Sequence, residues 1–325
     1  MHRAFRAFVL AVSLGGLAST AHAGVGYQHL TIPDPLGKPV EVGVWYPTDA
    51  AERPTSVELF SQELAPDAPV KGARLPLVVL SHGTGGGFAG HGDTARALAE
   101  AGFVAATLTH TGDNWRDQSQ ASQVWNRPRQ LRLLIDYMLA EWPQHDRIDA
   151  SRVGAFGFSA GGFTVLAAAG GEPDLTRVPG HCQAHPTFFE CMLVRAHPLA
   201  ANTPVAWTHD PRIKAVASAA PALGYAFGRE GLASVHVPLQ LWRASEDEIL
   251  PNPYYAEAVR QTLPTAPDFH LVQNAGHFDF LQPCPEQLAR SNPQICKSRP
   301  GFDRAAFHQD LNREVVAFFR KTLAP

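Results

Sequence analysis

One serine in the chain has the neighbours of a catalytic nucleophile. Ser159 lies between Gly157 and Gly161 in the stretch GFSAG, which matches the pattern G-x-S-x-G. A strand-like run, residues 152–158, precedes it, and a small-residue, helix-like run follows it at 160–169. A sharp turn from strand to helix would expose the hydroxyl at the positive end of the helix, with glycines leaving room for the turn. The alternative interpretation is a small residue that only packs a tight joint.

A serine hydroxyl is a weak nucleophile unless a base takes its proton. The stretch QNAGHFDF places His277 in a loop after a late strand, and WRASEDEILP places acidic residues after the preceding strand. The order serine, acid, histidine along the chain is the order found in α/β-hydrolases. We therefore expect His277 to accept the proton of Ser159 and later to give it to the leaving group. Activity should fall toward acidic pH, because only the neutral ring can act as a base.

The acid that orients the histidine is chosen from three adjacent residues, 246–248. Asp247 lies four residues before Pro251, as in D-x-x-x-P loops, and is the predicted partner of His277, with Glu246 as the next choice. Asp279 is closer to the histidine in sequence, and we expect it to hydrogen-bond its own loop instead.

A glycine-rich turn follows the first central strand. In SHGTGGG, residues 81–87, the main chain can approach a substrate closely. We predict an oxyanion hole made by the backbone N–H groups of Thr84 and Ala160. The turn lacks both G-x-G-x-x-G and a terminal G-K-[ST], so it does not predict a nucleotide site.

Strand-like and helix-like segments alternate along most of the chain. The expected strands are 40–47, 75–82, 103–110, 152–158, 213–220, 237–245 and 268–276, and the expected helices are 93–102, 126–142, 160–169 and 303–323. We place N-caps at Asp93 and Asn126. This alternation predicts an α/β-hydrolase fold with a mainly parallel sheet and helices on both faces. Residues 24–325 are interpreted as one domain, in which residues 170–211 form a cap-like insertion.

The first 23 residues have the features of a secretory signal peptide. Arg3 and Arg6 precede an apolar run over 8–18, and Ala21-His22-Ala23 fits a cleavage site. The run is too short and too interrupted by glycine to favour a membrane anchor. We expect an exported protein, either periplasmic or secreted.

Four cysteines remain after export, an even number that favours two disulfides in an oxidising compartment. Of the three possible pairings, proximity favours Cys182–Cys191 and Cys284–Cys296. His181, Cys182 and His185 superficially resemble zinc ligands, but a disulfide accounts better for the cysteine, and no metal is predicted.

The composition excludes several classes of partner. The 325 residues carry a net charge of −3, with 45% hydrophobic and 18% charged residues and no basic cluster. Such a chain can fill a large core, and nothing in it indicates nucleic acid binding or stable membrane insertion. No cofactor is expected.

Six spaced segments carry a family resemblance, and they are VGVWYPT, LSHGTGGG, DTARALAEAGFVAATLTHTGDN, NRPRQLRLLID, GAFGFSAGG and NAGHFDFL. Together they resemble the exported bacterial dienelactone-hydrolase-like proteins related to platelet-activating-factor acetylhydrolases. The resemblance implies the same fold, catalysis by Ser159, Asp247 and His277, and a preference for short or oxidised acyl chains on lipid-like esters. Dienelactone hydrolases proper use cysteine at the elbow, so Ser159 argues against lactone specificity.

The sequence thus predicts a serine carboxylesterase that acts through an acyl-enzyme on a small or lipid-like ester. The alternatives are an amide or peptide hydrolase with the same triad and a non-catalytic binding protein with the same fold. His110, Asp113 and Asn114 follow a central strand and either line the pocket or stabilise a turn. Trp115 and Trp125 are candidates for an acyl-site wall or for the core.

Overall fold

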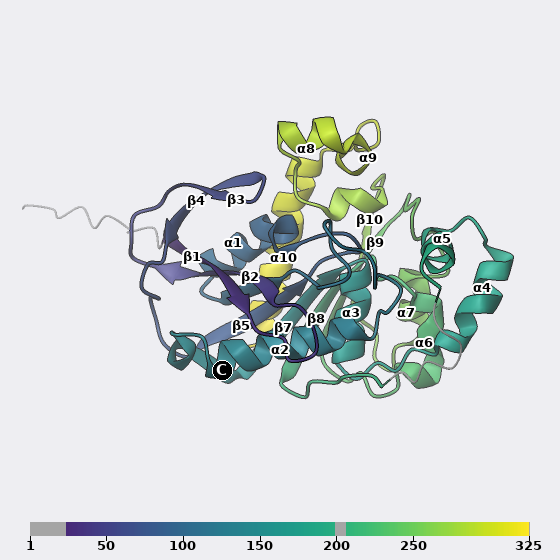
Figure 1. Ribbon diagram of the computed structural model, residues 1–325, viewed down its shortest axis with the longest axis horizontal. Coiled ribbons are helices and arrows are strands. Elements are labelled where there is room, and N and C mark those ends of the chain that lie inside the picture. Colours follow the sequence, from purple (N-terminus) through teal and green to yellow (C-terminus); the bar gives the residue numbers. More distant parts are fainter. Residues whose placement is uncertain (1–23, 199–205, 325) are drawn as a thin grey trace, which may run out of the picture.

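The computed structural model describes residues 24–198 and 206–324, which form a ten-stranded sheet with helices on both faces (Figure 1). The predicted signal peptide, residues 1–23, lies outside the described residues. The strands are β1 Gly24–Ile32, β2 Val40–Thr48, β3 Arg53–Val57, β4 Phe60–Pro66, β5 Leu75–Ser81, β6 Val104–Leu108, β7 Ile148–Phe158, β8 Ile213–Ala219, β9 Leu239–Ala244 and β10 Asp268–Val272. Their order in space is β10-β9-β8-β7-β5-β6-β2-β1-β4-β3.

Six neighbouring strands, from β10 to β6, are parallel to one another, and β2 pairs antiparallel with β6. The centre of the sheet is buried on both sides. In β5, Leu77 and Val79 belong to one core cluster, whereas Val78 and Leu80 belong to the other. The continuous apolar run of this strand follows from that double burial. The predicted fold, an α/β-hydrolase fold with a mainly parallel sheet, is confirmed.

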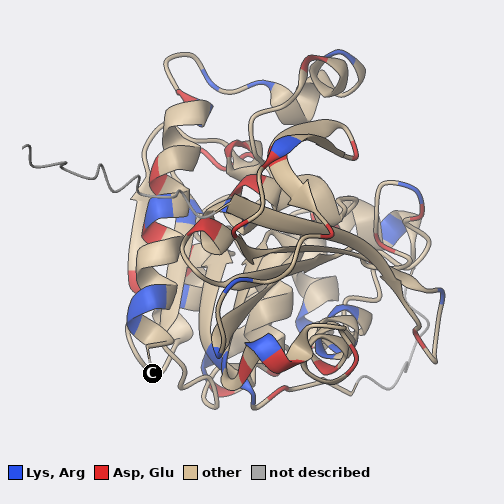
Figure 2. Ribbon diagram, turned by 90° about the vertical axis from the view of Figure 1, so that its left-hand side faces the viewer, with Lys and Arg blue, Asp and Glu red and all other residues tan. Residues whose placement is uncertain are grey.

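The helices are α1 Gly92–Glu100, α2 Asn126–Ala140, α3 Ala160–Ala168, α4 Val178–Ala184, α5 Phe189–Ala196, α6 Gly224–Gly231, α7 Ala256–Thr262, α8 Glu286–Ser291, α9 Pro293–Cys296 and α10 Arg304–Thr322. Helices α2 and α3 pack into one core cluster, and α1 and α10 pack into the other. Basic and acidic residues alternate along the ribbon instead of gathering by sign (Figure 2). Over the described ranges, no helix has the length and apolarity to cross a membrane.

Two predicted helix caps are wrong. His91 precedes α1, and Asp93 is the second residue of that helix, where it accepts hydrogen bonds from His308 and Asn312. Asn126 is the first residue of α2, and Trp125 occupies the cap position without a capping hydrogen bond. Neither helix has a side-chain hydrogen bond at its N-cap. The sequence patterns also do not predict strands β1, β3 and β4.

Both disulfide bonds form between cysteines close in sequence. Cys182–Cys191 joins α4 to α5, and Cys284–Cys296 encloses α8 and α9. These are the pairings that proximity along the chain favours. Two disulfides also fit an exported protein.

His91 is a buried histidine whose substitution would measure the cost of an unsatisfied polar side chain in the core. The His91 ring packs edge-on against Phe156 and Phe158, and neither of its ring nitrogens has a hydrogen-bond partner among the described residues. Burial, reinforced by His308, lowers the pKa of His91 to about 4. As the pH falls below about 6.5, His91 is protonated in the unfolded chain but stays neutral in the folded protein. The free energy of unfolding therefore decreases between about pH 6.5 and about pH 4.

We predict that His91→Phe raises the free energy of unfolding by about 1–3 kcal/mol, because it removes an unsatisfied buried imidazole. The gain should be larger at pH 5 than at pH 7. Urea unfolding at both pH values measures it. The exposed His236→Gln variant is the matched control, and equal pH dependence in wild type and His91→Phe would contradict the prediction.

Candidate active site

Ser159 lies at a strained turn between β7 and α3. Its backbone has φ 57° and ψ −118°, which places a non-glycine residue at positive φ. A Cβ at Gly157 would collide with the carbonyl of Gly161, and a Cβ at Gly161 would collide with the carbonyl of Ser81. The Ser159 amide donates to Ala219 O at 2.9 Å, so the neighbouring strand holds the turn in place. The two glycines are therefore required sterically by this elbow.

Three side chains from separate loops form a hydrogen-bonded chain. Ser159 Oγ lies 3.1 Å from His277 Nε2, and His277 Nδ1 lies 2.8 Å from Asp247 Oδ2. All three residues are at most 9% exposed. With the carboxylate accepting from Nδ1–H, Nε2 is free to accept the serine proton. The arrangement can generate an activated alkoxide nucleophile.

The structure brings Asp247, and neither other acid, to the histidine ring. The second oxygen of Asp247 accepts from the amides of Ile249 (3.1 Å) and Leu250 (2.7 Å), which fixes the carboxylate. Glu246, the other acid considered for this position, is half exposed and faces Arg299. Asp279 accepts from the amide of Gly276 and pairs with Arg304, so it hydrogen-bonds its own loop.

Thr84 and Ala160, the residues predicted to donate to an oxyanion, line the same cavity as Ser159. Ala160 is the first residue of α3, where helical amides lack a partner within the helix. Among the described residues, the amide of Thr84 also has no hydrogen-bond partner. Two free amides beside a nucleophile are suited to bind a developing oxyanion.

A buried arginine holds the loop that carries Thr84. Arg127, 2% exposed, donates to the carbonyl of His82, to Asp113 Oδ2 and, at 3.1 Å, to Thr164 Oγ1 of α3. Asp113 Oδ1 accepts from the amide of Gly85 at 3.0 Å. The Arg127–Asp113 ion pair thus connects His82 and Gly85, on either side of Thr84, to α3.

Two histidines complete this network. The amide of His110 donates to His82 Nε2 at 2.9 Å, and His82 Nδ1 lies 2.6 Å from Gly83 O. Burial, followed by the charge of Arg127, holds the pKa of both histidines well below 6.5, so both rings are neutral. His110, Asp113 and Asn114 therefore support the loop and the turn beneath it. Sequence reasoning missed Arg127, although its place on the apolar side of α2, four residues before Leu131, is a signal of a buried charge.

The cavity that contains Ser159 is small, about 30 Å³. Its walls include Phe163 of α3, Leu250, and the residues Phe189, Glu190 and Leu193 of α5. Helix α5 belongs to the 170–211 segment, so this segment reaches the serine. No periodic pattern in the sequence singles out Glu190, because a single acidic residue in an irregular stretch is usually interpreted as a surface residue.

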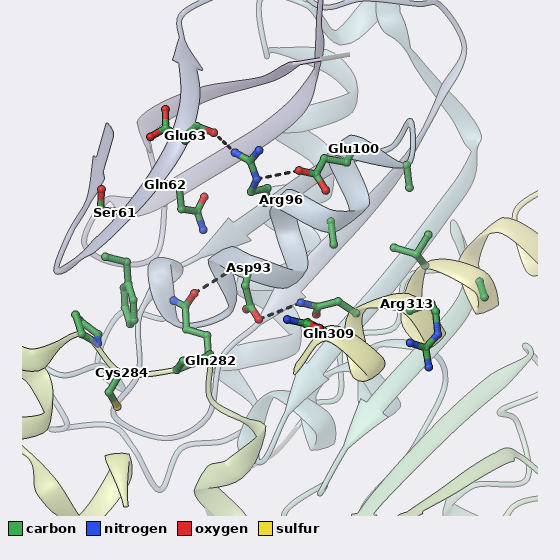
Figure 3. A pocket seen from close by; sticks show the side chains of 18 of the residues that line it. Ser61, Gln62, Glu63, Asp93, Arg96, Glu100, Gln282, Cys284, Gln309 and Arg313 are labelled. Carbon is green, nitrogen blue, oxygen red and sulfur yellow. Dashed lines mark hydrogen bonds and ion pairs between the residues drawn. The ribbon is translucent and has the colours of Figure 1, made fainter. Parts of the chain in front are cut away.

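Larger cavities lie elsewhere among the described residues. One, of about 1100 Å³, is lined by residues of α1, α10 and β4, with Arg96 paired with Glu100 and Asp93 hydrogen-bonded by Asn312 (Figure 3). None of Ser159, Asp247 and His277 lines it. A second, of about 800 Å³, lies against β9 and α10. A third, about 570 Å³ and mainly apolar, lies against Gly85, Gly86 and Gly87 of the oxyanion loop. Trp115 is on its wall, 57% exposed, whereas Trp125 is not among its lining residues.

The residues considered for zinc do not form a metal site. Cys182 is disulfide-bonded. The only potential metal-binding group among the described residues is His181, Glu190 and Cys191, and Cys191 is the disulfide partner of Cys182. A disulfide sulfur is not a thiolate ligand, so the group retains two donors.

Comparisons with known proteins agree with this geometry. A model of the prolyl oligopeptidase family matches residues 92–178, which contain the serine elbow. A ferulic acid esterase from Streptomyces cinnamoneus has a similar structure, with 20% sequence identity, a TM-score of 0.62, and coverage of 95% of this chain and 92% of that chain. A search of the curated proteins finds no match. Together with the site geometry, these findings indicate a serine hydrolase with an α/β-hydrolase fold.

The Arg127–Asp113 pair yields a prediction. Asp113→Ala should lower the free energy of unfolding by about 3–5 kcal/mol, because it leaves the buried guanidinium without its counter-ion. It should also lower kcat by at least tenfold in the folded protein, since Gly85 loses its anchor next to Thr84.

Asp117→Ala, in the same loop but in an exposed pair with Lys38, is the matched control and should change stability by no more than about 1 kcal/mol. Urea unfolding and ester hydrolysis under native conditions measure both effects. A folded Asp113→Ala protein with wild-type kcat would show that the pair stabilises the fold without positioning the loop.

Proposed function

We propose that the protein is a serine carboxylesterase that acts through an acyl-enzyme. The observation that carries this proposal is the chain from Ser159 Oγ through the His277 ring to Asp247, at 3.1 and 2.8 Å. Ser159 Oγ attacks the ester carbonyl while its proton passes to His277 Nε2. The amides of Thr84 and Ala160 hold the oxyanion.

Collapse of the tetrahedral intermediate breaks the ester C–O bond. His277 gives its proton to the departing alkoxide, which leaves as the alcohol, and the acyl group stays on Ser159. Water then loses a proton to the same nitrogen and attacks the acyl carbonyl. The products are the free acid and the regenerated serine. Asp247 orients the ring and stabilises its charged form throughout.

The cavity at Ser159 and the apolar cavity beside the oxyanion loop support a substrate with a short acyl group and a larger, apolar alcohol half. The cavity at the serine has room for a short acyl group, because about 30 Å³ corresponds to roughly two water-sized groups. The apolar cavity of about 570 Å³ is of the size that binds drug-like or lipid-like molecules. We assign the acyl group to the first and the alcohol half to the second, an arrangement that suits the lipid-like esters with short acyl groups implied by the resemblance to platelet-activating-factor acetylhydrolases. Residues 170–211 would act as the cap over the acyl group.

A second candidate is an amide or peptide hydrolase with the same triad. The match of residues 92–178 to the prolyl oligopeptidase family favours it. Equal turnover of an anilide and the ester with the same acyl group would support this candidate. Export of the mature chain from residue 24 into the periplasm or medium is part of the proposal in either case.

Hydrolysis of p-nitrophenyl esters from acetate to palmitate, by the mature protein and by Ser159→Ala, tests the proposed function. We expect turnover to be highest for acetate and propionate, and to fall by at least 10³-fold in the variant, since the nucleophile is lost. Labelling by a fluorophosphonate probe, present in the wild type and absent in the variant, reports the serine directly.

If wild type and Ser159→Ala are equally slow on every ester and neither is labelled, the protein is not a serine esterase, and the binding-protein alternative gains support. If long acyl chains are preferred, the assignment of the small cavity to the acyl group is wrong.

A further inference from the structure

The loop after β9, which carries Asp247, is hydrogen-bonded to the loop after β10, which carries His277. The Glu246 amide donates to Ala275 O at 3.0 Å. Two positions further along each loop, Glu248 Oε2 accepts from the backbone amide of His277 at 3.1 Å. Two adjacent acidic side chains thus bind the same residue, because Asp247 accepts from the ring at Nδ1 and Glu248 accepts from the main chain.

The carboxylate of Glu248 lies close against the main chain beside the catalytic ring. A Cβ at Gly276 would be 2.8 Å from Glu248 Oε2, so glycine leaves the room that the carboxylate needs to reach the next amide. In His277 only Cα and Cβ separate the amide nitrogen from the imidazole. By standard bond lengths, Glu248 Oε2 is therefore no more than about 7 Å from the nearest ring atom.

No cation is paired with Glu248 in the part of the chain that the structure describes. The hydrogen bond of its carboxylate goes to the neutral amide of His277. By contrast, the equally exposed Glu246 faces Arg299 at 4.0 Å. The negative charge of Glu248 is thus available to a positive charge that forms nearby, although water screens it in part because the residue is exposed.

The other groups around the histidine bring no unpaired positive charge to it. On its own loop, Asp279 is paired with Arg304. From β7, Phe158 packs against the His277 ring, and Phe158 in turn packs against His91. His91 is neutral near pH 7, because burial lowers its pKa to about 4.

In the proposed reaction the histidine itself becomes the positive charge. When Ser159 attacks, its proton passes to His277 Nε2, 3.1 Å away, and the ring becomes an imidazolium. Asp247 stabilises this cation from the other ring nitrogen. A second carboxylate within about 7 Å acts in the same direction, and more weakly where it is exposed to water and salt.

We propose that Glu248 is a second acidic positioning residue of the catalytic histidine: it holds the main chain of His277, and its charge stabilises the imidazolium that forms in each acyl transfer. This inference rests on the proposed function, in which His277 is the base. The hydrogen bond and the charge can be tested separately, since glutamine keeps an acceptor oxygen and removes the charge.

The first test is the pH dependence of kcat/KM for p-nitrophenyl acetate in wild type and in Glu248→Gln. Without the charge, the ring is a weaker base. We expect the midpoint of the acid limb to fall by about 0.3–1 pH unit and the plateau to fall about twofold to fivefold. Below the midpoint the two proteins should have similar activity, because the ring of the variant is less protonated there. General damage would instead lower the activity equally at every pH.

Glu246→Gln is the matched control, because it removes an adjacent exposed charge that faces Arg299. Its midpoint should stay within about 0.2 pH unit of wild type. In 1 M sodium chloride, where the Debye length is about 3 Å, the difference in midpoint between wild type and Glu248→Gln should shrink. An unchanged midpoint in Glu248→Gln would overturn the inference, as would an equal fall in Glu246→Gln or a difference that salt leaves unchanged.

Glu248→Ala removes both the charge and the acceptor for the His277 amide. We expect its plateau kcat/KM to be a further threefold to tenfold below that of Glu248→Gln, because the histidine loop loses a hydrogen bond. Equal plateaus in Glu248→Ala and Glu248→Gln would refute the role of Glu248 in holding the main chain.

An NMR titration of the His277 ring separates this inference from the proposed function. The ring signal is identified by its absence from the spectrum of His277→Gln. Its titration midpoint should be lower in Glu248→Gln than in wild type, whether or not the protein hydrolyses esters. If the midpoint falls and the wild type hydrolyses no ester, the esterase proposal fails and the action of Glu248 on the ring stands. If esters are hydrolysed and the midpoint does not move, the proposed function stands and the inference is refuted.

Discussion

The strained turn at Ser159 is the constraint on which the rest of the site depends. A residue at positive φ between β7 and α3 brings the serine hydroxyl above the sheet and places the Ala160 amide beside it. Strain of this kind costs of order 1–3 kcal/mol and persists only where the surroundings determine it. Here the carbonyls of Ser81 and Gly161 approach so closely that only glycine fits at 161 and 157, and two neighbouring strands, β5 and β8, clamp the turn.

A buried polar network connects the oxyanion loop to α3, the helix that follows Ser159. Arg127 bridges the loop at His82, the Asp113 carboxylate and Thr164 of α3, so the loop and the nucleophile helix share one set of hydrogen bonds. A buried ion pair of this kind adds little net stability compared with apolar packing, but losing one partner is costly. Its value in this molecule lies in fixing a glycine-rich loop that would otherwise be mobile.

The irregular 170–211 segment sets the character of the cavity. Its helix α5 supplies Phe189, Glu190 and Leu193 to the wall, and a disulfide anchors that helix to α4. The sheet and the elbow position the serine, whereas part of the cavity wall around it comes from α5, outside the sheet. Figure 1 shows α4 and α5 together, beyond the sheet edge formed by β9 and β10.

The sequence alone determined the alternation of strands and helices, the serine elbow and the chain order of serine, acid and histidine, because these depend on local periodicity and on glycine sterics. It left β1, β3 and β4 unrecognised and put caps at Asp93 and Asn126, since these strands and helix ends depend on distant partners. Only the tertiary structure decided that Asp247 rather than Glu246 meets His277, a contact between residues 30 positions apart. Only it showed that Arg127 is buried against Asp113 and that α5 contributes to the wall of the cavity at Ser159. The sheet brings the ends of its strands together and thereby decides which side chains of different loops are in contact. Spacing along the chain does not encode these contacts.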